Sequence, residues 1–188
     1  MTLKLGIHWF RQDLRLTNNQ SLEALSNKVD KIIPIYILDP EQRMGSVSKW
    51  WLEQSLNKLS YNIEKKNGKL NIFEGNPLSI ISSLVSDNNI QFFYWNRLYD
   101  PYSITRDKKI KSSLKLRHIN CETFNSYLLN EPWDIKNKSG SFFKVFTPFW
   151  KTNFEILSKK LVSQSSKKYN FYNKDIISAL KIEELKLN

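Results

Sequence analysis

The sequence alternates five times between a short apolar run and a segment with helical periodicity. The apolar runs lie at residues 3–10, 30–40, 69–75, 90–97 and 119–125. They are continuously apolar rather than alternating between apolar and polar residues, which is typical of strands buried on both faces. We therefore predict an α/β fold with an open, doubly wound parallel sheet that helices cover on both sides.

The clearest helix of the sequence spans residues 45–68. Leu52, Leu56 and Ile63 recur there at helical spacing, and Gly68 follows where the helix is expected to stop. We predict further helices at residues 17–27, 76–89 and 100–118.

The pattern changes after residue 125. The segment SYLLNEPWDIKNKSGSFFKVFTPFWK is aromatic and has little periodicity. We expect residues 142–150 to pack on the sheet, because each large apolar side chain left in water forgoes about 1.5–3 kcal/mol. Residues 163–188 are polar and rich in lysine, so we predict a mobile or loosely packed linker there. The predicted domain accordingly spans residues 1–162.

Composition limits the class of protein. A chain of 188 residues suits one domain with an appendage, and no run approaches the apolar length of a membrane span. Cys121 is the single cysteine, which excludes an internal disulfide and favours a reducing cytoplasm. The net charge of +11 has two interpretations: a polyanionic partner such as nucleic acid, or compositional drift towards lysine.

The stretch HWFRQDLRL raises the question of why a buried strand runs into Arg11, Asp13 and Arg15. Ligands of open α/β sheets bind at the carboxyl ends of the strands, where this loop is expected to lie. An aspartate flanked by two arginines stays ionised and can fix the loop through charged hydrogen bonds. The alternative is that Arg11 or Gln12 also contacts an anionic ligand.

Several common catalytic and cofactor motifs are absent from the sequence. The five glycines form neither GxGxxG nor a phosphate-binding P-loop, and no GxSxG elbow is present. One cysteine and two distant histidines, His8 and His118, give no support for a metal site. We identify no catalytic residue, so the sequence predicts a ligand-binding scaffold.

Two adjacent tryptophans begin the long helix at residues 50 and 51. Neighbouring helical positions cannot both face the core. We expect Trp51 to pack with Leu52 and Ser55, and Trp50 to line the crevice and stack on a flat ring. The alternative is that both are half-buried packing residues.

Four segments in order resemble the N-terminal α/β domain of the DNA photolyase/cryptochrome family: HWFRQDLRLTNNQSL, RMGSVSKWWLEQSLNKL, FYWNRLYDP and FFKVFTPFWK. The resemblance runs from about residue 3 to 151. It implies a five-stranded sheet in the order 3-2-1-4-5, followed by an extended interdomain linker. In this family the domain carries an antenna chromophore. FAD and the site for damaged DNA belong to a separate helical C-terminal domain, which the resemblance implies is absent from this chain.

The resemblance also implies a chromophore site. Asp39, Met44 and Ser48 match positions that line the antenna pocket of deazaflavin-binding relatives, and Asp100 matches a crevice position. Folate-binding relatives have an Asn-Glu pair where this chain has Tyr102-Ser103. A flavin or 8-hydroxydeazaflavin antenna is therefore expected in preference to methenyltetrahydrofolate. The predicted cofactor-binding residues are Arg11, Gln12, Asp39, Met44, Ser48, Trp50 and Asp100.

These expectations favour the light-harvesting domain of a deoxyribodipyrimidine photolyase, with the helical FAD domain as its partner and damaged DNA reached through that domain. Three alternatives stay open: the corresponding half of a cryptochrome photoreceptor, an unrelated nucleotide-binding α/β enzyme, and a remnant without ligand. The chain alone is expected neither to repair DNA nor to hold FAD, because the cofactor that performs the chemistry belongs to the other domain.

Overall fold

The structure is a computed structural model that describes residues 3–87, 89–125, 127–158, 168–174, 176 and 179–187. Five strands form one parallel sheet in the order β3-β2-β1-β4-β5, which confirms the predicted fold. The strands are β1 (Leu5–Phe10), β2 (Lys31–Leu38), β3 (Asn71–Glu74), β4 (Phe92–Asn96) and β5 (Asn120–Phe124). The helices are α1 (Gln20–Ser26), α2 (Ser46–Glu64), α3 (Pro77–Asp87), α4 (Pro101–Leu116), α5 (Phe146–Ser158) and the 3-10 helix η1 (Ile182–Leu185).

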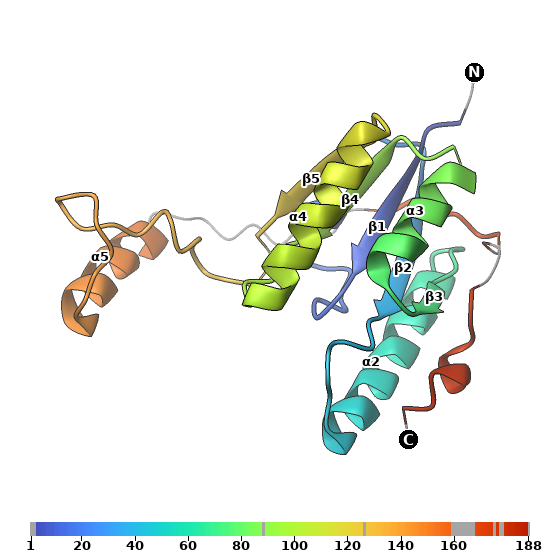
Figure 1. Cartoon of the computed structure of the whole chain (residues 1–188), viewed down its shortest axis with the longest axis horizontal. Helices are drawn as coiled ribbons and strands as arrows, with labels where there is room; N and C mark the ends of the chain where they lie inside the picture. The colour runs from blue at the N-terminus through green and yellow to red at the C-terminus, as the bar shows by residue number, and fades with distance from the viewer. Residues whose placement is uncertain are drawn as a thin grey trace.

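Helices cover both faces of the sheet, as the sequence predicts (Figure 1). Leu22 of α1 and Leu59 of α2 form one core with Phe10 of β1. On the opposite face, Ile81 of α3 and Ile110 of α4 belong to a second core. None of the helices in the described ranges is long and apolar enough to cross a membrane.

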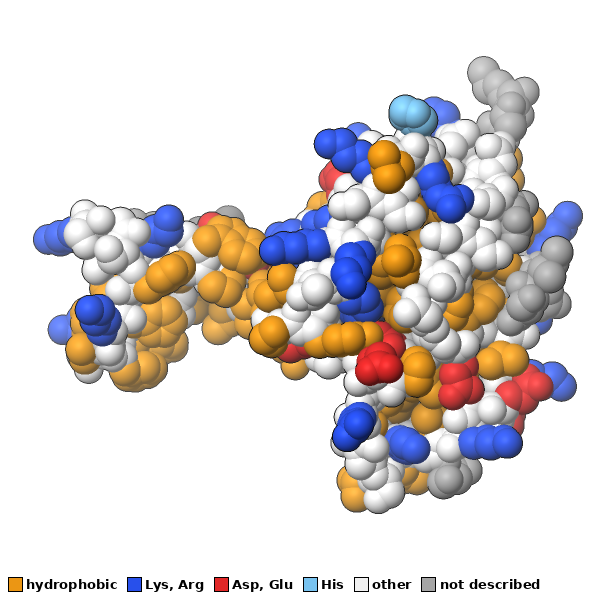
Figure 2. Space-filling view, viewed as in Figure 1, with side chains coloured by type: hydrophobic (Ala, Val, Ile, Leu, Met, Phe, Trp, Pro, Cys, Tyr) orange, Lys and Arg blue, Asp and Glu red, His pale blue; other side chains and the backbone are white. Residues whose placement is uncertain are grey.

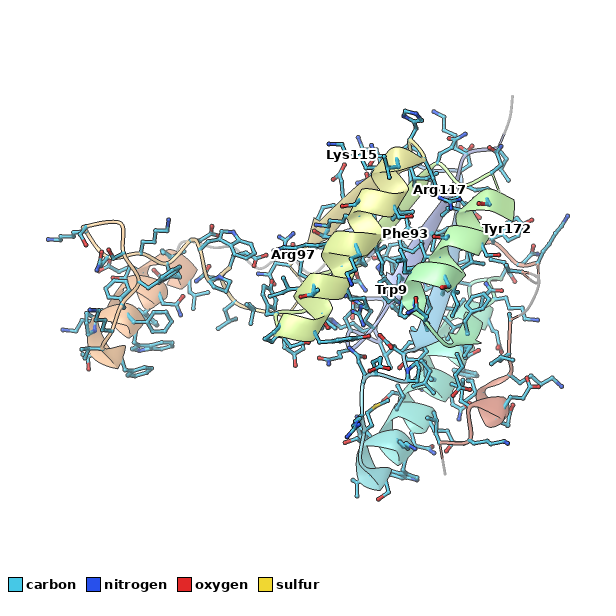
Figure 3. The ribbon with its side chains drawn as sticks, in the orientation of Figure 1. Trp9, Phe93, Arg97, Lys115, Arg117 and Tyr172 are labelled. Carbon is cyan, nitrogen blue, oxygen red and sulfur yellow. The ribbon has the colours of Figure 1, made fainter. Side chains whose placement is uncertain are left out.

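The central strand β1 contributes to both cores. Trp9 lies on the α3/α4 side near Phe93 of β4 (Figure 3), with ring centroids 6.5 Å apart, whereas Phe10 belongs to the opposite core. Successive side chains of a strand point to opposite faces, so a central strand covered on both sides buries both sets of side chains and is mostly apolar. This explains why β1 reads as a continuous apolar run.

The same strand buries a histidine. His8 is fully buried, and its Nε2 lies 2.6 Å from Oγ of Ser21 in α1. Burial lowers the pKa of His8 to about 4, because the protonated ring would lose its hydration. His8 is therefore neutral in the folded protein at physiological pH.

We expect acid to destabilise the fold through His8. The unfolded side chain takes up a proton near pH 6.5 and the folded one only near pH 4. The contribution of the neutral His8 to the free energy of unfolding is thus fully present above pH 6.5 and is lost between pH 6.5 and 4, by about 3 kcal/mol in total. In urea unfolding across this pH range, the free energy of unfolding of His8→Asn should fall less steeply than that of the parent protein. His118→Asn at an exposed position is the control, and an unchanged slope in His8→Asn would contradict the assignment.

The C-terminal segment is packed, so the prediction of a mobile or loosely packed linker is wrong for its described residues. Tyr169, Phe171 and Ile176 are buried, as are Leu185 and Leu187. The segment runs beside the first residues of β2, which β3 does not reach because it pairs with β2 only from Ile35 onward. There, Tyr172 N donates to Ile32 O at 2.8 Å. Farther along, Leu180 N donates to Ile72 O at 2.7 Å. The segment therefore covers the β3 edge of the sheet and closes part of the first core.

The aromatic segment does not pack on the sheet, which corrects the second expectation about the C-terminal part of the chain. It forms the start of α5, and the helix stands away from the sheet (Figure 1). Phe142, Phe146 and Trp150 are exposed, and Figure 2 shows hydrophobic side chains gathered over this helix. The helix α5 therefore presents an aromatic face without cover in the described chain.

The segment that leads from β5 to α5, residues 127–145, is called the neck here. It is anchored at the end of β4. Arg97 donates from Nη2 to Oε1 of Glu131 at 2.6 Å, and Tyr99 Oη donates to Oε2 of the same carboxylate at 2.7 Å. Arg97 also lies over the Trp133 ring, 5.5 Å from its centroid. Burial, followed by the Glu131 hydrogen bond, raises the pKa of Tyr99 to about 12. This anchor ties the chain near residue 131 to the end of β4, and Asn130 Nδ2 in turn donates to Asn153 Oδ1 of α5 at 2.5 Å.

Candidate functional site

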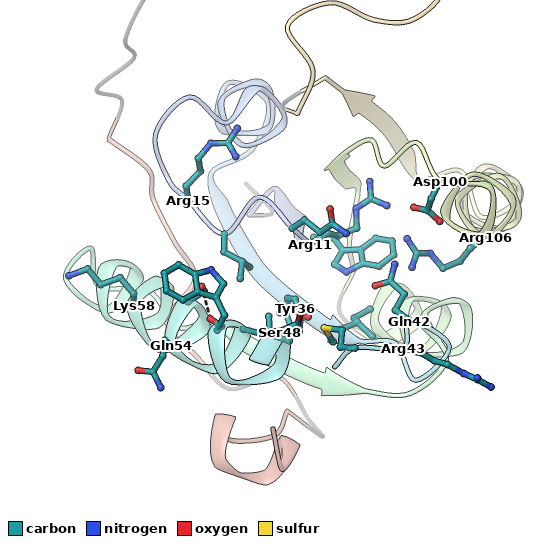
Figure 4. A pocket seen from close by; sticks show the side chains of 18 residues that line it. Arg11, Arg15, Tyr36, Gln42, Arg43, Ser48, Gln54, Lys58, Asp100 and Arg106 are labelled. Atoms are coloured by element: carbon teal, nitrogen blue, oxygen red, sulfur yellow. Dashed lines mark hydrogen bonds between the residues drawn. The ribbon is translucent and has the colours of Figure 1, made fainter. Parts of the chain in front are cut away.

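A cavity of about 900 Å³ opens at the carboxyl ends of the central strands (Figure 4). This is the edge at which open α/β sheets bind their ligands. One wall is α2, and the loop that follows β1 forms part of the opposite side. The lining residues are Trp9, Arg11, Gln12, Leu14, Arg15, Tyr36, Ile37, Gln42, Arg43, Met44, Ser48, Trp51, Leu52, Gln54, Ser55, Lys58, Asp100 and Arg106.

The α2 wall is a single helical stripe. Ser48, Trp51, Leu52 and Ser55 are spaced by three, one and three residues, which places them on one face of the helix. Trp51 is 65% exposed although it belongs to this wall. The wall therefore presents an indole ring that a flat ligand could cover.

Two guanidinium groups lie against Trp9 at the floor of the cavity. The Cζ atoms of Arg11 and Arg106 are each 5.1 Å from the centroid of the Trp9 ring. Such contacts stabilise a cation by about 0.5–2 kcal/mol, and more when it is desolvated. All three side chains are buried, so the floor is a fixed surface.

A chain of buried ion pairs holds the two arginines. Arg11 Nη1 lies 2.7 Å from Oδ2 of Asp107, and Arg106 Nη2 lies 3.1 Å from Oδ1 of the same carboxylate. Arg106 Nη1 in turn lies 3.0 Å from Oδ2 of Asp39. Tyr102 Oη donates to that Asp39 oxygen at 2.8 Å, and burial followed by this bond raises the pKa of Tyr102 to about 12. The network fixes α4 to the ends of β1 and β2.

The loop after β1 answers the question that its sequence raises. Asp13 Oδ1 accepts a hydrogen bond from Arg11 N at 3.0 Å, and its Oδ2 accepts from the side-chain amides of Asn19 and Asn96. Asp13 thus ties the loop to α1 and β4, which agrees with a structural role. The Arg11 guanidinium reaches Asp107 on α4, a partner 96 positions away that the local sequence could not reveal.

Five of the seven predicted site residues line the cavity: Arg11, Gln12, Met44, Ser48 and Asp100. Their role in binding a cofactor stays a prediction. Asp100 also caps α4, with Oδ1 accepting from Ser103 N at 2.8 Å. Burial alone would raise the pKa of Asp100, but the hydrogen bonds from Ser103 bring it below the usual value.

The structure does not place Asp39 and Trp50 on the cavity wall. Asp39 is buried, and its carboxylate is engaged by Arg106, by Tyr102 and, at 3.2 Å, by Glu41 N. Trp50 is not among the lining residues, whereas Trp51 is, so the expectation that Trp50 lines the crevice is not met. The expected packing of Trp51 is wrong as well, because its ring is 65% exposed. Adjacent side chains of a helix point in different directions, so only one of the two rings lies on the cavity stripe.

Sequence reasoning missed Trp9, Tyr36, Gln42 and Arg106 as lining residues. Trp9 and Tyr36 lie inside apolar strand runs, where a site residue looks like a core residue. Gln42 lies in the segment 39–48, which was recognisable as a strand-end loop. Arg106 lies within a lysine-rich helix, and nothing in the sequence distinguished it from the other basic residues there as a residue of the site. Among the residues that the structure describes, no cluster of three or more His, Cys, Asp or Glu side chains could hold a metal ion.

Comparison with known proteins identifies similar chains. The family model of DNA photolyase matches residues 6–166. A deoxyribodipyrimidine photo-lyase of Agrobacterium fabrum is 37% identical over 154 residues, covering 80% of this chain and 32% of that protein. Cryptochrome-2 of Arabidopsis thaliana is 34% identical over 153 residues, covering 79% and 25%. This chain therefore spans about a third or less of the length of these relatives.

Two solved structures are similar over almost the whole chain. A bacterial class III photolyase from Agrobacterium tumefaciens has a TM-score of 0.88 and 30% identity, covering 100% of this chain and 39% of that one. An archaeal photolyase from Sulfolobus tokodaii, described with two FAD molecules that imply a novel light-harvesting cofactor, has a TM-score of 0.80 and 26% identity. That alignment covers 97% of this chain and 41% of the archaeal one.

Proposed function

Because this chain belongs to the DNA photolyase family, we propose that it is the light-harvesting domain of a deoxyribodipyrimidine photolyase, which repairs pyrimidine dimers with light. The strand-end cavity holds an antenna chromophore, and excitation passes from it to FAD in a helical domain outside this chain. The observation that carries the proposal is the cavity itself, which lies at the ligand-binding edge of the sheet and combines apolar side chains, among them Trp9, Trp51 and Leu52, with polar and charged ones. Small-molecule pockets combine apolar and aromatic walls with polar groups that fix the orientation of the ligand.

The lining residues fit a flat heteroaromatic ring. Trp51 and Leu52 offer one apolar wall, and the polar side chains of Gln12, Gln42 and Ser48 can hydrogen-bond to the edge of a ring. The chromophore supplies the light absorption when it is bound. The residues of this chain hold it, orient it and exclude water from its faces.

A flavin or 8-hydroxydeazaflavin chromophore fits better than methenyltetrahydrofolate. At the positions of the Asn-Glu pair of folate-binding relatives, Tyr102 donates to Asp39, and Ser103 is fully buried. These two positions therefore offer no carboxylate to the amino group of a pterin. Fluorescence titrations with riboflavin, 8-hydroxy-5-deazariboflavin and methenyltetrahydrofolate test the assignment. Tight binding of the folate alone would reverse it.

Adjacent tryptophans provide a matched test of the ring site. Trp51→Ala removes an indole from the cavity wall, and we expect it to weaken flavin binding roughly tenfold, since ring stacking contributes about 1 kcal/mol or more. Trp50→Ala removes an indole of similar exposure that does not line the cavity, and it should leave the affinity nearly unchanged. Equal losses in both variants would argue against this cavity as the ring site.

The partner in this proposal is the helical domain, and α5 supports its docking. Phe146, Trp150 and Phe154 recur every four residues, with the first two rings nearly parallel at 8° and 6.3 Å apart. Their exposed fractions are 70%, 43% and 58%. A continuous exposed aromatic face of this kind marks an interaction surface.

We expect this chain alone, with reduced FAD and light, to leave pyrimidine dimers intact. Repair needs a flavin within reach of a flipped-out lesion, and the cavity here is assigned to the antenna. The helical domain of the Agrobacterium photolyase, added separately, should bind this chain in size-exclusion chromatography. Phe146→Ala with Trp150→Ala should abolish that binding, and Leu116→Ala, an exposed control, should not. Dimer reversal by the chain alone, above a control without protein, would refute the proposal.

A cryptochrome photoreceptor is the second candidate, and the 34% identity to Arabidopsis cryptochrome-2 favours it. Signalling and repair differ in the helical domain. A complex with the cognate helical domain that absorbs light but leaves dimers intact would favour this alternative.

A further inference from the structure

The outward face of α4 concentrates positive charge. Exposed basic side chains occupy the second half of this helix and the turn that follows it: Lys108, Lys109, Lys115 and Arg117. The other long helices are balanced, since α2 carries two lysines and two glutamates and α5 one of each. Figure 2 shows Lys and Arg side chains along the α4 face. The net charge of +11 is therefore not spread evenly over the described helices.

No acidic side chain offsets this charge on α4 itself. The one acid between residues 101 and 118 is Asp107, which is buried and paired with Arg11 and Arg106. Glu122 of β5 points to the opposite face of the sheet, where its Oε1 accepts from Tyr94 Oη at 2.9 Å. Within the described ranges, none of the four exposed basic residues forms a salt bridge. Their charge is therefore available to a partner.

The packing of α4 decides which of its side chains point outward. Ile110 and Leu114 are buried in the core between α3, α4 and the sheet. The exposed positions of Lys108, Ser112 and Lys115 are spaced by four and three residues, which places them in one stripe along the helix. The stripe runs along the helix axis, so its charges form a row.

Two further basic residues border this row. Arg117 extends it towards α3, where its Nη1 donates to Ser86 Oγ at 2.5 Å (Figure 3). Lys111 is turned inward, because its Nζ donates to Thr123 Oγ1 at 2.8 Å and lies 5.8 Å from the centroid of the Trp95 ring. Lys111 therefore adds to the local positive potential, whereas the exposed residues are the ones that can make contacts.

The shape and composition of the row fit a nucleic-acid duplex better than a bilayer. A helix rises about 1.5 Å per residue, so Lys108 and Arg117 are separated by roughly 13 Å along the axis. A duplex carries one negative charge per about 1.7 Å of its axis, so several phosphates lie within this length. Leu116 is exposed, but it is the single large apolar side chain that residues 108–117 expose. The face therefore lacks the apolar stripe by which amphipathic helices enter a bilayer.

We propose that the α4 face binds the phosphate backbone of duplex nucleic acid irrespective of base sequence. Lysine and arginine side chains donate to phosphate oxygens and release condensed counterions, and such contacts carry no sequence information. None of the four exposed basic residues lines the strand-end cavity. The inference therefore goes beyond the antenna function and does not depend on it.

Fluorescence anisotropy of the whole chain with a labelled, undamaged duplex tests this surface. Four phosphate contacts predict that the logarithm of the binding constant falls with the logarithm of salt concentration with a slope of about −3 to −4. Lys108→Gln with Lys115→Gln should weaken binding roughly tenfold at low salt and make the slope less steep by about 2. Lys49→Gln with Lys66→Gln removes the same charge from exposed positions outside α4. This control should change the affinity by less than about twofold.

Equal losses in the two double variants would overturn the inference, because net charge rather than the α4 face would then determine binding. A duplex that does not bind at low salt, or an affinity that depends on base sequence, would also overturn it. Binding to vesicles containing phosphatidylserine but not to the duplex would identify a membrane partner instead. Riboflavin titration of the α4 variant should match that of the parent protein, which verifies the fold and separates this inference from the antenna proposal.

Discussion

Replacing Asp107 by alanine is expected to lower the free energy of unfolding by about 3–5 kcal/mol, since it leaves buried cations without their partner. The Asp107 carboxylate accepts from Arg11 at 2.7 Å, from both Nε and Nη2 of Arg106, and from Trp95 Nε1 at 2.9 Å. Among the described residues, Nε and Nη2 of Arg11 have no hydrogen-bond partner, so the loss of Asp107 would remove the ion pair that holds this guanidinium. Chemical denaturation measures the effect.

A graded series distinguishes charge from packing at this position. Asp107→Asn keeps the size and one acceptor, so it should cost less than Asp107→Ala. Lys109→Ala, at an exposed position of the same helix, should change stability by less than about 0.5 kcal/mol. A loss below about 1 kcal/mol in Asp107→Ala would mean that the network contributes little net stability, as some buried ion pairs do.

Phe171→Ala is expected to cost about 3–5 kcal/mol, as large-to-small changes of buried aromatic residues do. The Phe171 side chain is 1% exposed and packs so closely on Gly68 that a Cβ at this glycine would overlap it. The loss would show that residues 168–187 stabilise the sheet domain. The left-handed turn after α2 is made by Asn67, with φ of 55°, so the contact with Phe171 is what requires glycine at position 68.

The control for this prediction lies on α5. Phe154→Ala removes a ring that is 58% exposed, and it should leave stability nearly unchanged. Thermal unfolding of both variants gives the comparison. Similar small losses in the two would restore the view of the C-terminal segment as loosely attached.

The pattern of apolar and polar residues was enough to predict the sheet and its main helices. Residues such as Ile7, Ile35 and Phe93 lie in runs that are mostly apolar and do not alternate, which is typical of strands covered on both faces. The strand ends then locate the ligand edge, so Gln12, Ser48 and Asp100 could be placed near one cavity before any coordinates were known. These features follow from periodicity and chain order, which are local properties of a sequence.

Which side chains at that edge face the cavity, and which segments are covered, depends on how the elements pack in three dimensions. The Asp39 carboxylate is bound by Arg106, 67 positions away, and Trp51 rather than Trp50 lines the cavity because of the phase of α2. The polar C-terminal segment is packed because Phe171 contacts Gly68 and Leu180 pairs with Ile72 at the β3 edge, whereas the aromatic start of α5 is exposed in the described chain. The contacts of Asp39 and of the C-terminal segment join residues that are distant in the chain, and composition alone carries no information about such partners.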